Sequence, residues 1–402
     1  MEAFKGWLDR NIVQHSHVTV EEFAGTGRGM KATKNISNGD TIFSVPRKLF
    51  LSVSSSSESL QKVSWHELVS TQLEQIFQTE QISTDESLVI LLLHEKSKAD
   101  SLWKEYFPTL PTQYTNTVCW NDEQVEELRG SNLYHLTLRL KQQVREDFAI
   151  LMEKTTRWKN DLGFEMTFEN YLWALCTVWS RSFDLNMNGQ TVRVLVPFAD
   201  LFNHQPLVRT RHQYDEATDS ITCISQESFS QGQQVFFNYG AFPNMKLLRV
   251  YGFVIERNPF DLVDLYCPMS PYAPLFEQKT QLLSTMGVSN DTAFGLQSGR
   301  LNETLLRTLR IQRIESLSQI IDCMDATKDS ILSKDNEDSV ITSLMEGLNA
   351  MLSAYPTTLE SDLRADKLKL SYEERSALVL RTSEKLTIKN HLALLAEKKK
   401  AL

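Results

Sequence analysis

Residues 192–206, Val-Arg-Val-Leu-Val-Pro-Phe-Ala-Asp-Leu-Phe-Asn-His-Gln-Pro, form the stretch that decides the fold. Valines occupy every second position from Val192 to Val196, and Ile221-Thr-Cys223 alternates in the same way. Val235-Phe-Phe237 is a short apolar run, and turn-forming dipeptides such as Asn-Gly and Gln-Gly separate these segments. Alternation between turn signals is typical of half-buried strands. The sequence therefore predicts a group of short β-strands from about residue 190 to residue 257.

A long helical segment precedes these strands. From about residue 60 to residue 182, apolar residues recur three and four positions apart, which favours helices. Thr41-Ile-Phe-Ser-Val45, which comes before a proline, is a further predicted strand. Because that strand lies far from the others in the sequence, we expect a β-rich fold that a helical insert divides. Helices are predicted within the insert at Leu88–Glu95, from Asn121, over Leu133–Trp158 and from Thr167.

Helices are also predicted at both ends of the chain. Ser371-Tyr-Glu-Glu374 has the pattern of a capping box, and Lys398-Lys-Lys400 suits the negative end of a helix dipole. This helical tail follows a few extended residues after Asn258-Pro259, whereas the Ser-rich segment 52–59 is predicted to be a loop. Within residues 1–20, four apolar residues are spaced for one face of a short helix, namely Phe4, Trp7, Leu8 and Ile12.

The composition excludes several classes of protein. The chain has 402 residues, of which 41% are hydrophobic and 23% charged, so it can build the cores of about two to three domains. Its 42 Lys and Arg against 51 Asp and Glu give a formal charge of -9, which argues against a dedicated nucleic-acid-binding protein. The N-terminus lacks the apolar segment of a secretory signal, and no apolar run approaches the roughly 20 residues of a membrane span.

The cysteines give no sign of a metal site or a disulfide framework. They are odd in number and widely spaced, at Cys119, Cys176, Cys223, Cys267 and Cys323. No Cys-x-x-Cys pair occurs, so a zinc site built from local cysteine pairs is unsupported. Scattered thiols of this kind indicate a reducing compartment.

Gly25-Thr-Gly-Arg-Gly29 is the first of three segments that could carry chemistry. Glycines permit a positive φ and a close approach of the backbone to a ligand. A P-loop is excluded because no Gly-Lys-Ser/Thr follows these glycines. A dinucleotide-binding turn is excluded because no strong strand precedes the segment and no helix follows it. Taken alone, the pattern favours a tight turn that leads into a strand.

Asp200, Asn203 and His204 form the second segment. Asp200 and His204 lie four residues apart, so one helical turn would bring them to one face as metal ligands or as an acid–base pair. No third ligand is evident. Asn and His side chains that cap a turn with their own hydrogen bonds are the commoner arrangement.

Tyr239 and Tyr251 mark the third segment, and each is followed by glycine. Buried tyrosines usually pack in a core. A tyrosine at the end of a strand can also direct its hydroxyl into a pocket. Both interpretations stay open on the residues alone.

In their order along the chain, these segments resemble the SET-domain protein methyltransferases, more narrowly the class of the Rubisco large-subunit lysine methyltransferase. The resemblance covers most of the chain. It departs from the family pattern at Gln205, where serine is usual, and in the aromatic residue of Ala241-Phe-Pro-Asn244. The matching residues are Gly27-Arg-Gly29, Lys34-Asn-Ile36, Gly39–Pro46, Trp173-Ala174, Ser180-Arg-Ser-Phe183, Asp200–His204, Asn238-Tyr-Gly240, Asn244, Tyr251-Gly-Phe253, and, in the tail, Tyr355–Glu360, Arg375, Ala377-Leu378, Arg381 and Glu384-Lys385.

The resemblance implies an α+β architecture, with a β-rich SET fold that is interrupted by a helical insert and followed by an all-helical C-terminal substrate-binding domain. The N-terminal helix and the first part of the SET domain would span residues 1–58, and the insert 59–182. The second part of the SET domain, with the catalytic motifs, would span 183–257, and the C-terminal domain 258–402. The Cys-rich zinc segment of histone-type SET enzymes is absent, so no metal is expected.

The resemblance also implies a site for S-adenosyl-L-methionine beside a lysine channel. We expect Tyr239 to be the catalytic residue, because its hydroxyl can hold the transferring methyl group by C–H···O contacts. Asp200, Tyr214 and Tyr251 would bind the substrate in the channel, where desolvation favours the neutral amine. The residues expected to contact the cofactor are Thr26, Gly27, Arg28, Arg181, Asn203, His204 and Tyr239.

The expected activity is transfer of a methyl group from S-adenosylmethionine to a lysine side chain. The partner would be a ribosomal protein, a histone or another basic protein, with no nucleic acid or membrane involved. We expect a monomer in the cytoplasm, the nucleus or both. Three alternatives are methylation of another side chain such as histidine, a catalytically silent binding module, and a metal hydrolase built on Asp200 and His204. The two tyrosines favour lysine, and the intact motif side chains argue against a silent module.

Overall fold

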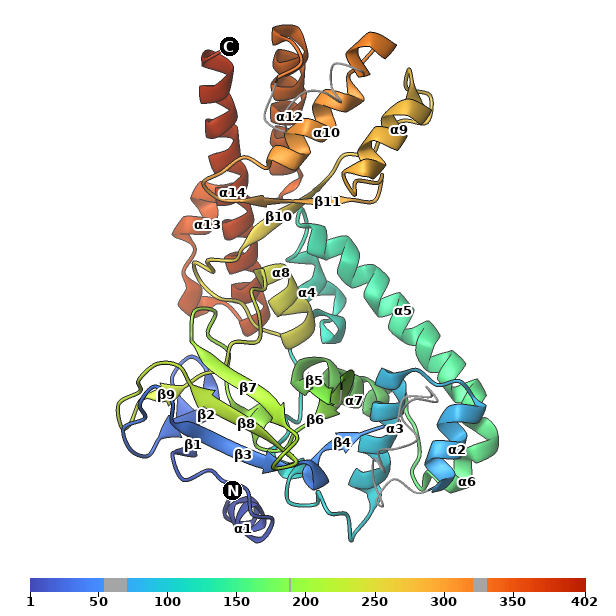
Figure 1. The fold of residues 1–402 in the computed structure, drawn as a ribbon, viewed down its shortest axis with the longest axis vertical. Helices are drawn as coiled ribbons and strands as arrows, with labels where there is room; N and C mark the ends of the chain where they lie inside the picture. The colour runs from blue at the N-terminus through green and yellow to red at the C-terminus, as the bar shows by residue number, and fades with distance from the viewer. Residues whose placement is uncertain (54–70, 188, 321–330) are drawn as a thin grey trace. The chain divides into compact units, whose positions relative to one another are not determined.

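The computed structural model describes residues 1–53, 71–187, 189–320 and 331–402, which form two compact units (Figure 1). Residues 120–138, which the sequence analysis assigned to the insert, belong to the second unit. The predicted loop at 52–59 lies, beyond Val53, outside the described residues. The first unit comprises Met1–Cys119, Arg139–Ala241 and Val250–Gly252, and the second comprises Trp120–Leu138, Phe242–Arg249 and Phe253–Leu402.

Three antiparallel sheets among the described residues build the first unit, with the strand orders β1-β2-β9, β3-β8-β7 and β4-β6-β5 (Figure 1). Each sheet pairs strands that precede the insert with strands that follow it, which confirms the divided β-rich fold. The strands are β1 (Val18–Phe23), β2 (Gly27–Ala32), β3 (Thr41–Pro46), β4 (Leu51–Ser52), β5 (Ser182–Met187), β6 (Gln190–Leu195), β7 (Thr210–Asp215), β8 (Ser220–Ser225) and β9 (Gln234–Val235).

The last part of the predicted strand group is helical instead. β9 ends at Val235, and α8 (Asn244–Lys246) continues into the π-helical turn η7 (Leu247–Tyr251). Leu247 and Leu248 are both buried, which a half-buried strand with alternating faces does not allow. Tyr251 therefore lies at the end of a helical turn rather than at the end of a strand.

The predicted helices of the insert are confirmed where they are described. Capping boxes begin α3 at Ser83 and α7 at Thr167, each with the side chain three residues later bonded back to the cap. At the N-terminus α1 ends at Arg10, so Ile12 is 74% exposed and does not join the buried face that was predicted for it. The helices are α1 (Glu2–Arg10), α2 (Thr71–Thr79), α3 (Thr84–Ser97), α5 (Asn132–Thr155), which begins in the second unit, α6 (Lys159–Leu162) and α7 (Phe168–Arg181).

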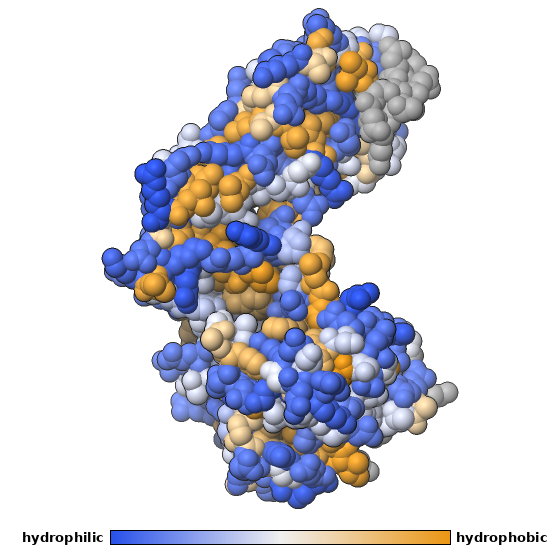
Figure 2. Space-filling model, turned by 90° about the vertical axis from the view of Figure 1, so that its left-hand side faces the viewer, coloured by the Kyte–Doolittle hydropathy of each residue, from blue (hydrophilic) through white to orange (hydrophobic). Residues whose placement is uncertain are grey.

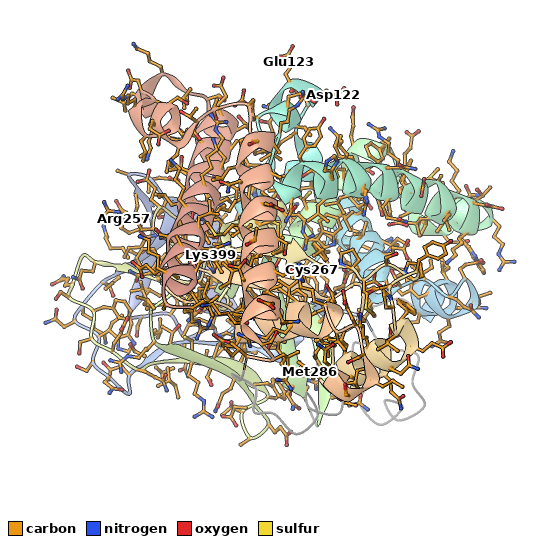
Figure 3. The ribbon with its side chains drawn as sticks, turned by 90° about the horizontal axis from the view of Figure 1, so that it is seen from above. Asp122, Glu123, Arg257, Cys267, Met286 and Lys399 are labelled. Atoms are coloured by element: carbon orange, nitrogen blue, oxygen red, sulfur yellow. The ribbon has the colours of Figure 1, made fainter. Side chains whose placement is uncertain are left out.

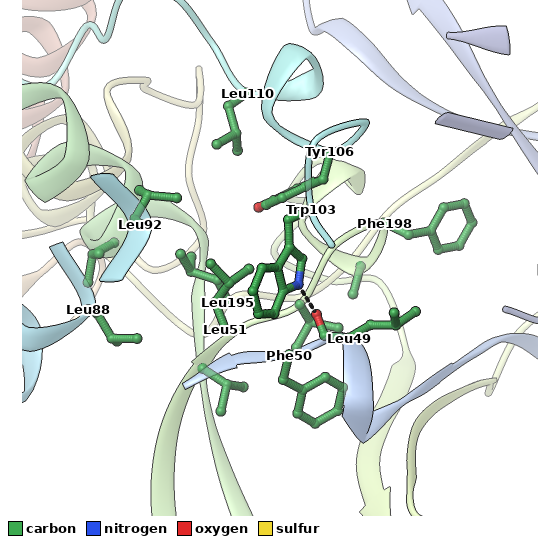
Figure 4. Packing of buried hydrophobic residues seen from close by; sticks show 14 of the residues in the cluster. Leu49, Phe50, Leu51, Leu88, Leu92, Trp103, Tyr106, Leu110, Leu195 and Phe198 are labelled. Carbon is green, nitrogen blue, oxygen red and sulfur yellow. Dashed lines mark hydrogen bonds between the residues drawn. The ribbon is translucent and has the colours of Figure 1, made fainter. Parts of the chain in front are cut away.

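One hydrophobic core joins the strands of the first unit to the insert (Figure 4). The indole of Trp103, which is almost fully buried, donates a hydrogen bond to the carbonyl oxygen of Leu49 at 2.8 Å. Tyr106 lies beside it, and leucines of α3, β4 and β6 fill the space around the two rings (Figure 4). Each buried leucine contributes roughly 1.5–3 kcal/mol to stability relative to an exposed one, so this core holds the insert against the sheets.

The second unit has the predicted helical character, although the expectation of an all-helical region missed one sheet. β10 (Leu262–Tyr266) and β11 (Ala293–Gln297) pair antiparallel. Each strand alternates over only five residues, and Gly295 faces Leu262 with no Cβ, so the sequence pattern is weak. The helices are α4 (Asp122–Glu126), α8, α9 (Phe276–Thr285), α10 (Glu303–Gln312), α12 (Lys334–Ala354), α13 (Leu359–Arg364) and α14 (Tyr372–Lys400).

The two longest helices of the second unit, α12 and α14, pack side by side (Figure 3). The predicted capping box of Ser371 and Glu374 begins α14, and lysines occupy its last turn as expected. Lys399, labelled in Figure 3, pairs with Asp338 of α12 at 3.1 Å. Deeper in the same unit, Arg310 and Glu337 form a bidentate ion pair with both side chains fully buried.

Hydrophilic residues cover most of the face that Figure 2 shows, with apolar residues in patches between them. Among the helices that the structure describes, none is both long enough and apolar enough to cross a bilayer.

The carboxyl group of Glu384 should make the stability of the second unit depend on pH. It is buried and accepts hydrogen bonds from Ser131 Oγ and from the Tyr355 hydroxyl, both at 2.8 Å. Burial raises its pKa to about 7, and Asp261 and Asp264 add to the increase. Since the folded pKa exceeds the unfolded value, this group stabilises the fold below pH ~4.3 and loses that contribution as the pH rises through 7.

We expect Glu384→Gln to remove this loss, which is on the order of 3 kcal/mol. Calorimetric melting at pH 5 and pH 8 should show a fall in Tm for the native chain and a smaller fall for the variant. The control is Glu360→Gln, which alters an exposed pair with Lys389. Equal falls in the native chain and the Glu384 variant would contradict the assignment.

Candidate active site

The side-chain amide of Asn203 joins the two parts of the divided β fold. Its Nδ2 donates to the carbonyl oxygens of Thr26 at 3.2 Å and Arg28 at 3.1 Å. A Cβ on Gly29 would lie 2.7 Å from this Nδ2 and 2.3 Å from Nε2 of Gln234. Glycine at position 29 is therefore required for the two amides to reach the β2 backbone.

The segment Gly25–Gly29 is a tight turn at Gly25 and Thr26 that leads into β2 at Gly27, as predicted, but the expectation that no strong strand precedes it is wrong. β1 runs to Phe23 and pairs along its length with β2. Gly25 and Gly27 have φ values of 87° and 65°, which glycine adopts without strain. A Cβ on either glycine would meet no other atom within 4 Å, so the turn borders open space. Thr26 Oγ1 donates to Oε1 of Gln234 at 3.0 Å.

A buried polar cluster forms around Asp200. Its Oδ2 accepts a hydrogen bond from the Tyr106 hydroxyl at 2.7 Å and lies 3.3 Å from Nη1 of Arg181. The same Nη1 donates to the Asp200 carbonyl oxygen at 2.8 Å. Phe198, which precedes the cluster, has a φ of 81° although it is not glycine, and packing against Phe43 and Phe202 holds it there.

Arg181 is the permanent charge of this cluster. Burial opposes its charge, but Asp200 and three nearby phenols outweigh that effect and raise its pKa above the ordinary value. Burial also raises the pKa of Asp200, although Arg181 counteracts it, and raises the pKa of Tyr106. The Arg28 guanidinium, whose pKa burial lowers, bonds to the carbonyl oxygen of Thr109 nearby.

His204 and the two predicted tyrosines form a stack of rings. The His204 and Tyr239 rings lie 5.0 Å apart, and those of Tyr239 and Tyr251 lie 5.1 Å apart. The backbone N–H of Tyr239 donates to Nδ1 of His204 at 3.0 Å, and the same nitrogen lies 3.3 Å from the carbonyl oxygen of Phe237. The Tyr239 hydroxyl donates to the carbonyl oxygen of Phe202. Burial raises the pKa of Tyr239 and of Tyr251 and lowers that of His204, so all three rings are neutral near pH 7.

Tyr214 does not join this group. Its hydroxyl donates to Asp219 in the turn between β7 and β8, and Asp219 also pairs with Arg47 at 2.7 Å. His212, two residues earlier on β7, stacks on Phe237 with ring centroids 5.7 Å apart. His212 and Tyr214 are two residues apart and therefore share one face of β7, and Tyr214 packs at the edge of the same core while its hydroxyl is held by Asp219. Its contacts do not support the predicted role of Tyr214 in the lysine channel.

Two residues of the site were missed by the sequence analysis. Tyr106 contacts Asp200, and Tyr114, whose hydroxyl lies 2.8 Å from Thr177 Oγ1, contributes to the charge balance of Arg181. Both come from the irregular segment after α3, where no periodic pattern indicates which side chains turn inward. The one signal in the sequence is that residues 103–114 contain several aromatic residues close together.

The Asp200 cluster and the residues beside the glycine turn contain buried hydrogen-bond donors and an acceptor without a partner among the described residues. Asp200 Oδ1, Arg181 Nε and Gln234 Nε2 are buried and have no hydrogen-bond partner in the described part of the chain. A ligand with an ammonium and a carboxylate would match a carboxylate oxygen and two N–H donors, and the open turn at Gly25–Gly27 leaves its backbone accessible. Over the described ranges, no three His, Cys, Asp or Glu side chains are grouped to hold a metal ion, and Asp200 and His204 bond to different partners.

Two protein families match successive parts of the chain. Residues 27–240 match the SET domain, and residues 270–387 match the family described as Rubisco LSMT substrate-binding. Together they cover Gly27–Gly29, the Asp200 cluster, Tyr239 and residues 270–387 of the second unit.

Similar proteins with two different named substrates are found at the same level of identity. The chain is 25% identical to the chloroplastic Rubisco large subunit N-methyltransferase of Pisum sativum, over 96% of this chain and 80% of that protein. It is also 25% identical to the actin-histidine N-methyltransferase of Mus musculus, over 94% of this chain and 65% of that protein. The solved structure of Rubisco LSMT bound to sinefungin and monomethyllysine matches with a TM-score of 0.82 at 25% identity, over 99% of this chain and 92% of that chain. The structure of Rubisco LSMT bound to AdoMet gives a TM-score of 0.81 at 24% identity.

Replacement of Arg181 by methionine should destabilise the first unit by roughly 3–5 kcal/mol, because Asp200 would stay buried without the cation that bonds to it. Urea unfolding followed by tryptophan fluorescence measures this loss. Arg193→Met is the control, since it removes the half-exposed pairs with Asp184 and Asp85 and should cost about 1 kcal/mol. Equal losses in the two variants would show that the buried pair is not a determinant of stability.

Proposed function

The chain belongs to the SET domain family and is an S-adenosylmethionine-dependent protein methyltransferase, and we propose that it methylates the side-chain amine of a lysine. The observation that carries the choice of lysine is the pair of half-buried phenols, Tyr239 and Tyr251, with ring centroids 5.1 Å apart. A narrow channel lined by neutral aromatic rings suits a long aliphatic side chain with a single reacting nitrogen. The partner is a protein substrate, and we propose a basic protein.

The cofactor would supply an electrophilic methyl group on a sulfonium, and the protein would hold that methyl group and the substrate amine in position. We propose that the backbone from Thr26 to Arg28, with Asn203 and Arg181, binds the cofactor. Methyl transfer needs the amine and the methyl carbon in line, so orientation accounts for much of the rate. The Asp200–Arg181 pair, which is fixed by Tyr106, provides that orientation with a rigid, dry boundary.

Tyr239 is held so that its oxygen can accept weak contacts. Because its proton is directed at the carbonyl oxygen of Phe202, its lone pairs remain available for the C–H bonds of a transferring methyl group. Its raised pKa keeps it neutral, so it is not the base that deprotonates the amine. A lysine amine has a reference pKa of about 10.4, and desolvation between Tyr239 and Tyr251 would lower it toward neutrality.

Methylation of histidine is the second candidate, because an actin-histidine methyltransferase matches this chain at the same 25% identity as the Rubisco large subunit N-methyltransferase. The two are separated by incubating the enzyme with a proteome and deuterated S-adenosylmethionine, followed by peptide mass spectrometry. We expect the label on lysine Nζ. Label confined to imidazole nitrogens would overturn the proposal in favour of histidine.

Cofactor binding should be visible without any substrate. A ligand at 100 times its Kd stabilises the protein that binds it by about 2.7 kcal/mol. We expect S-adenosylmethionine and its demethylated product to raise the Tm of the first unit, and Asn203→Ala to abolish the shift. No shift in the native chain would contradict the methyltransferase assignment for either side chain.

Tyr239→Phe should lower kcat by roughly 10²–10³, as expected for the loss of one preorganised polar group. Circular dichroism and the thermal shift with the cofactor check that the variant folds and binds. The same change at Tyr214 is a matched control, because its hydroxyl bonds to Asp219 and should leave kcat unchanged. Near-native turnover in the Tyr239 variant would remove Tyr239 from the mechanism.

A further inference from the structure

Two cysteines that are 57 residues apart in the sequence are in contact. Sγ of Cys119 lies 3.6 Å from Sγ of Cys176. Cys119 is the last residue of the 3₁₀ turn η4 (Thr117–Cys119) and is exposed, whereas Cys176 is buried within α7. A disulfide bond is about 2.05 Å long, so a movement of roughly 1.5 Å would join the two sulfurs. The spacing of the cysteines in the sequence gave no sign of this pair.

The pKa values of the two thiols are shifted in opposite directions. The hydrogen bond from Cys176 lowers the pKa of Cys119, and Lys141 adds a smaller attraction for its thiolate. The same hydrogen bond and burial raise the pKa of Cys176. Reaction with an oxidant follows thiolate character and exposure, so Cys119 is the sulfur that is oxidised first.

We propose that Cys119 and Cys176 are a peroxide-sensitive dithiol, in which Cys119 is oxidised and Cys176 resolves the product as a disulfide. The Cys119 thiolate attacks one oxygen of hydrogen peroxide, the O–O bond breaks, and hydroxide leaves as a sulfenic acid forms. The Cys176 sulfur then attacks Cys119 Sγ, the S–O bond breaks, and the departing hydroxide takes the Cys176 proton as water. Two thiols lose two electrons in total, and the peroxide is reduced to two molecules of water.

The segment that carries Cys119 also holds Tyr251. Thr115 Oγ1 donates to the carbonyl oxygen of Gly252 at 2.8 Å, and Asn116 Nδ2 donates to that of Val250. These two bonds fix the backbone on both sides of Tyr251. A disulfide at Cys119 therefore pulls on the segment that positions one wall of the proposed channel.

The helix that carries Cys176 also ends in Arg181, five residues later. Between them Thr177 contacts the Tyr114 hydroxyl at 2.8 Å, and Ser180 Oγ donates to the Cys176 carbonyl oxygen. The disulfide thus connects the two supports of the site, and its effect on turnover rests on the proposed function. A misplacement of about 1 Å can cost about 10²-fold in rate, so we expect turnover to fall by roughly 10- to 100-fold.

The test uses the full chain with Cys323→Ser, because Cys323 lies outside the described residues. The protein is treated with hydrogen peroxide, free thiols are alkylated, and peptides are mapped without reduction. We expect one cross-linked peptide pair that contains Cys119 and Cys176, a fall in turnover, and recovery of both after dithiothreitol.

The variants separate the two thiols from the other cysteines. Cys119→Ser should keep its turnover in peroxide, and Cys176→Ala should instead accumulate over-oxidised Cys119. Cys267→Ser is the matched control, since Cys267 lies in the second unit (Figure 3) and should leave the response unchanged.

Each outcome decides one part of the proposal. Peptide mapping does not depend on activity, so a chain that fails to methylate lysine can still show the disulfide. Oxidation of Cys119 to sulfinic acid without a disulfide, or no reaction at all, would overturn the dithiol. A disulfide that forms without any change in turnover would overturn its coupling to the site.

Discussion

The amide of Asn203 is the group on which the rest of the site depends. It bonds to two carbonyl oxygens that lie 177 and 175 residues away in the sequence, across the insert. Closing a segment of that length costs conformational entropy, which the three divided sheets and the shared core must offset. Once the amide is in place, the next residue, His204, pairs with Phe237 in an isolated β-bridge beyond the end of β9, and its ring accepts the backbone N–H of Tyr239. One side chain thus fixes the turn, the histidine and the tyrosine.

The cluster around Asp200 gives that site its electrostatic character. A carboxylate and a guanidinium in an apolar core contribute little net stability, because the desolvation of two charges offsets much of their attraction. The pair instead fixes the positions of the side chains around it, because the hydrogen bond from Tyr106 and the strained backbone at Phe198 hold Asp200 in one orientation. The permanent positive charge of Arg181 beside Asp200 favours a ligand that carries both a positive and a negative group. The neutral phenols of Tyr239 and Tyr251 favour an uncharged amine at the reacting end of the substrate.

The same supports that position the site contain the contacting thiols. α7 ends in Arg181 and carries Cys176, while the segment before Cys119 holds the backbone around Tyr251. Interiors that are packed at crystal density transmit small displacements rather than absorbing them. A covalent change between these two elements therefore reaches the phenol pair through a few direct contacts.

The sequence by itself determined the elements and the identity of most functional groups. Alternation at Val192–Val196, the helical spacing of the insert, the capping box at Ser371 and the ordered motifs predicted a divided β-rich fold with a helical tail. These signals are local, because they depend on residues two to four positions apart. Only the tertiary structure decided that Tyr106 and Tyr114 face Arg181, that Tyr214 turns to Asp219, and that Cys119 meets Cys176. Contacts across 57 to 177 residues are set by how the insert packs on the sheets, and no local pattern records that packing.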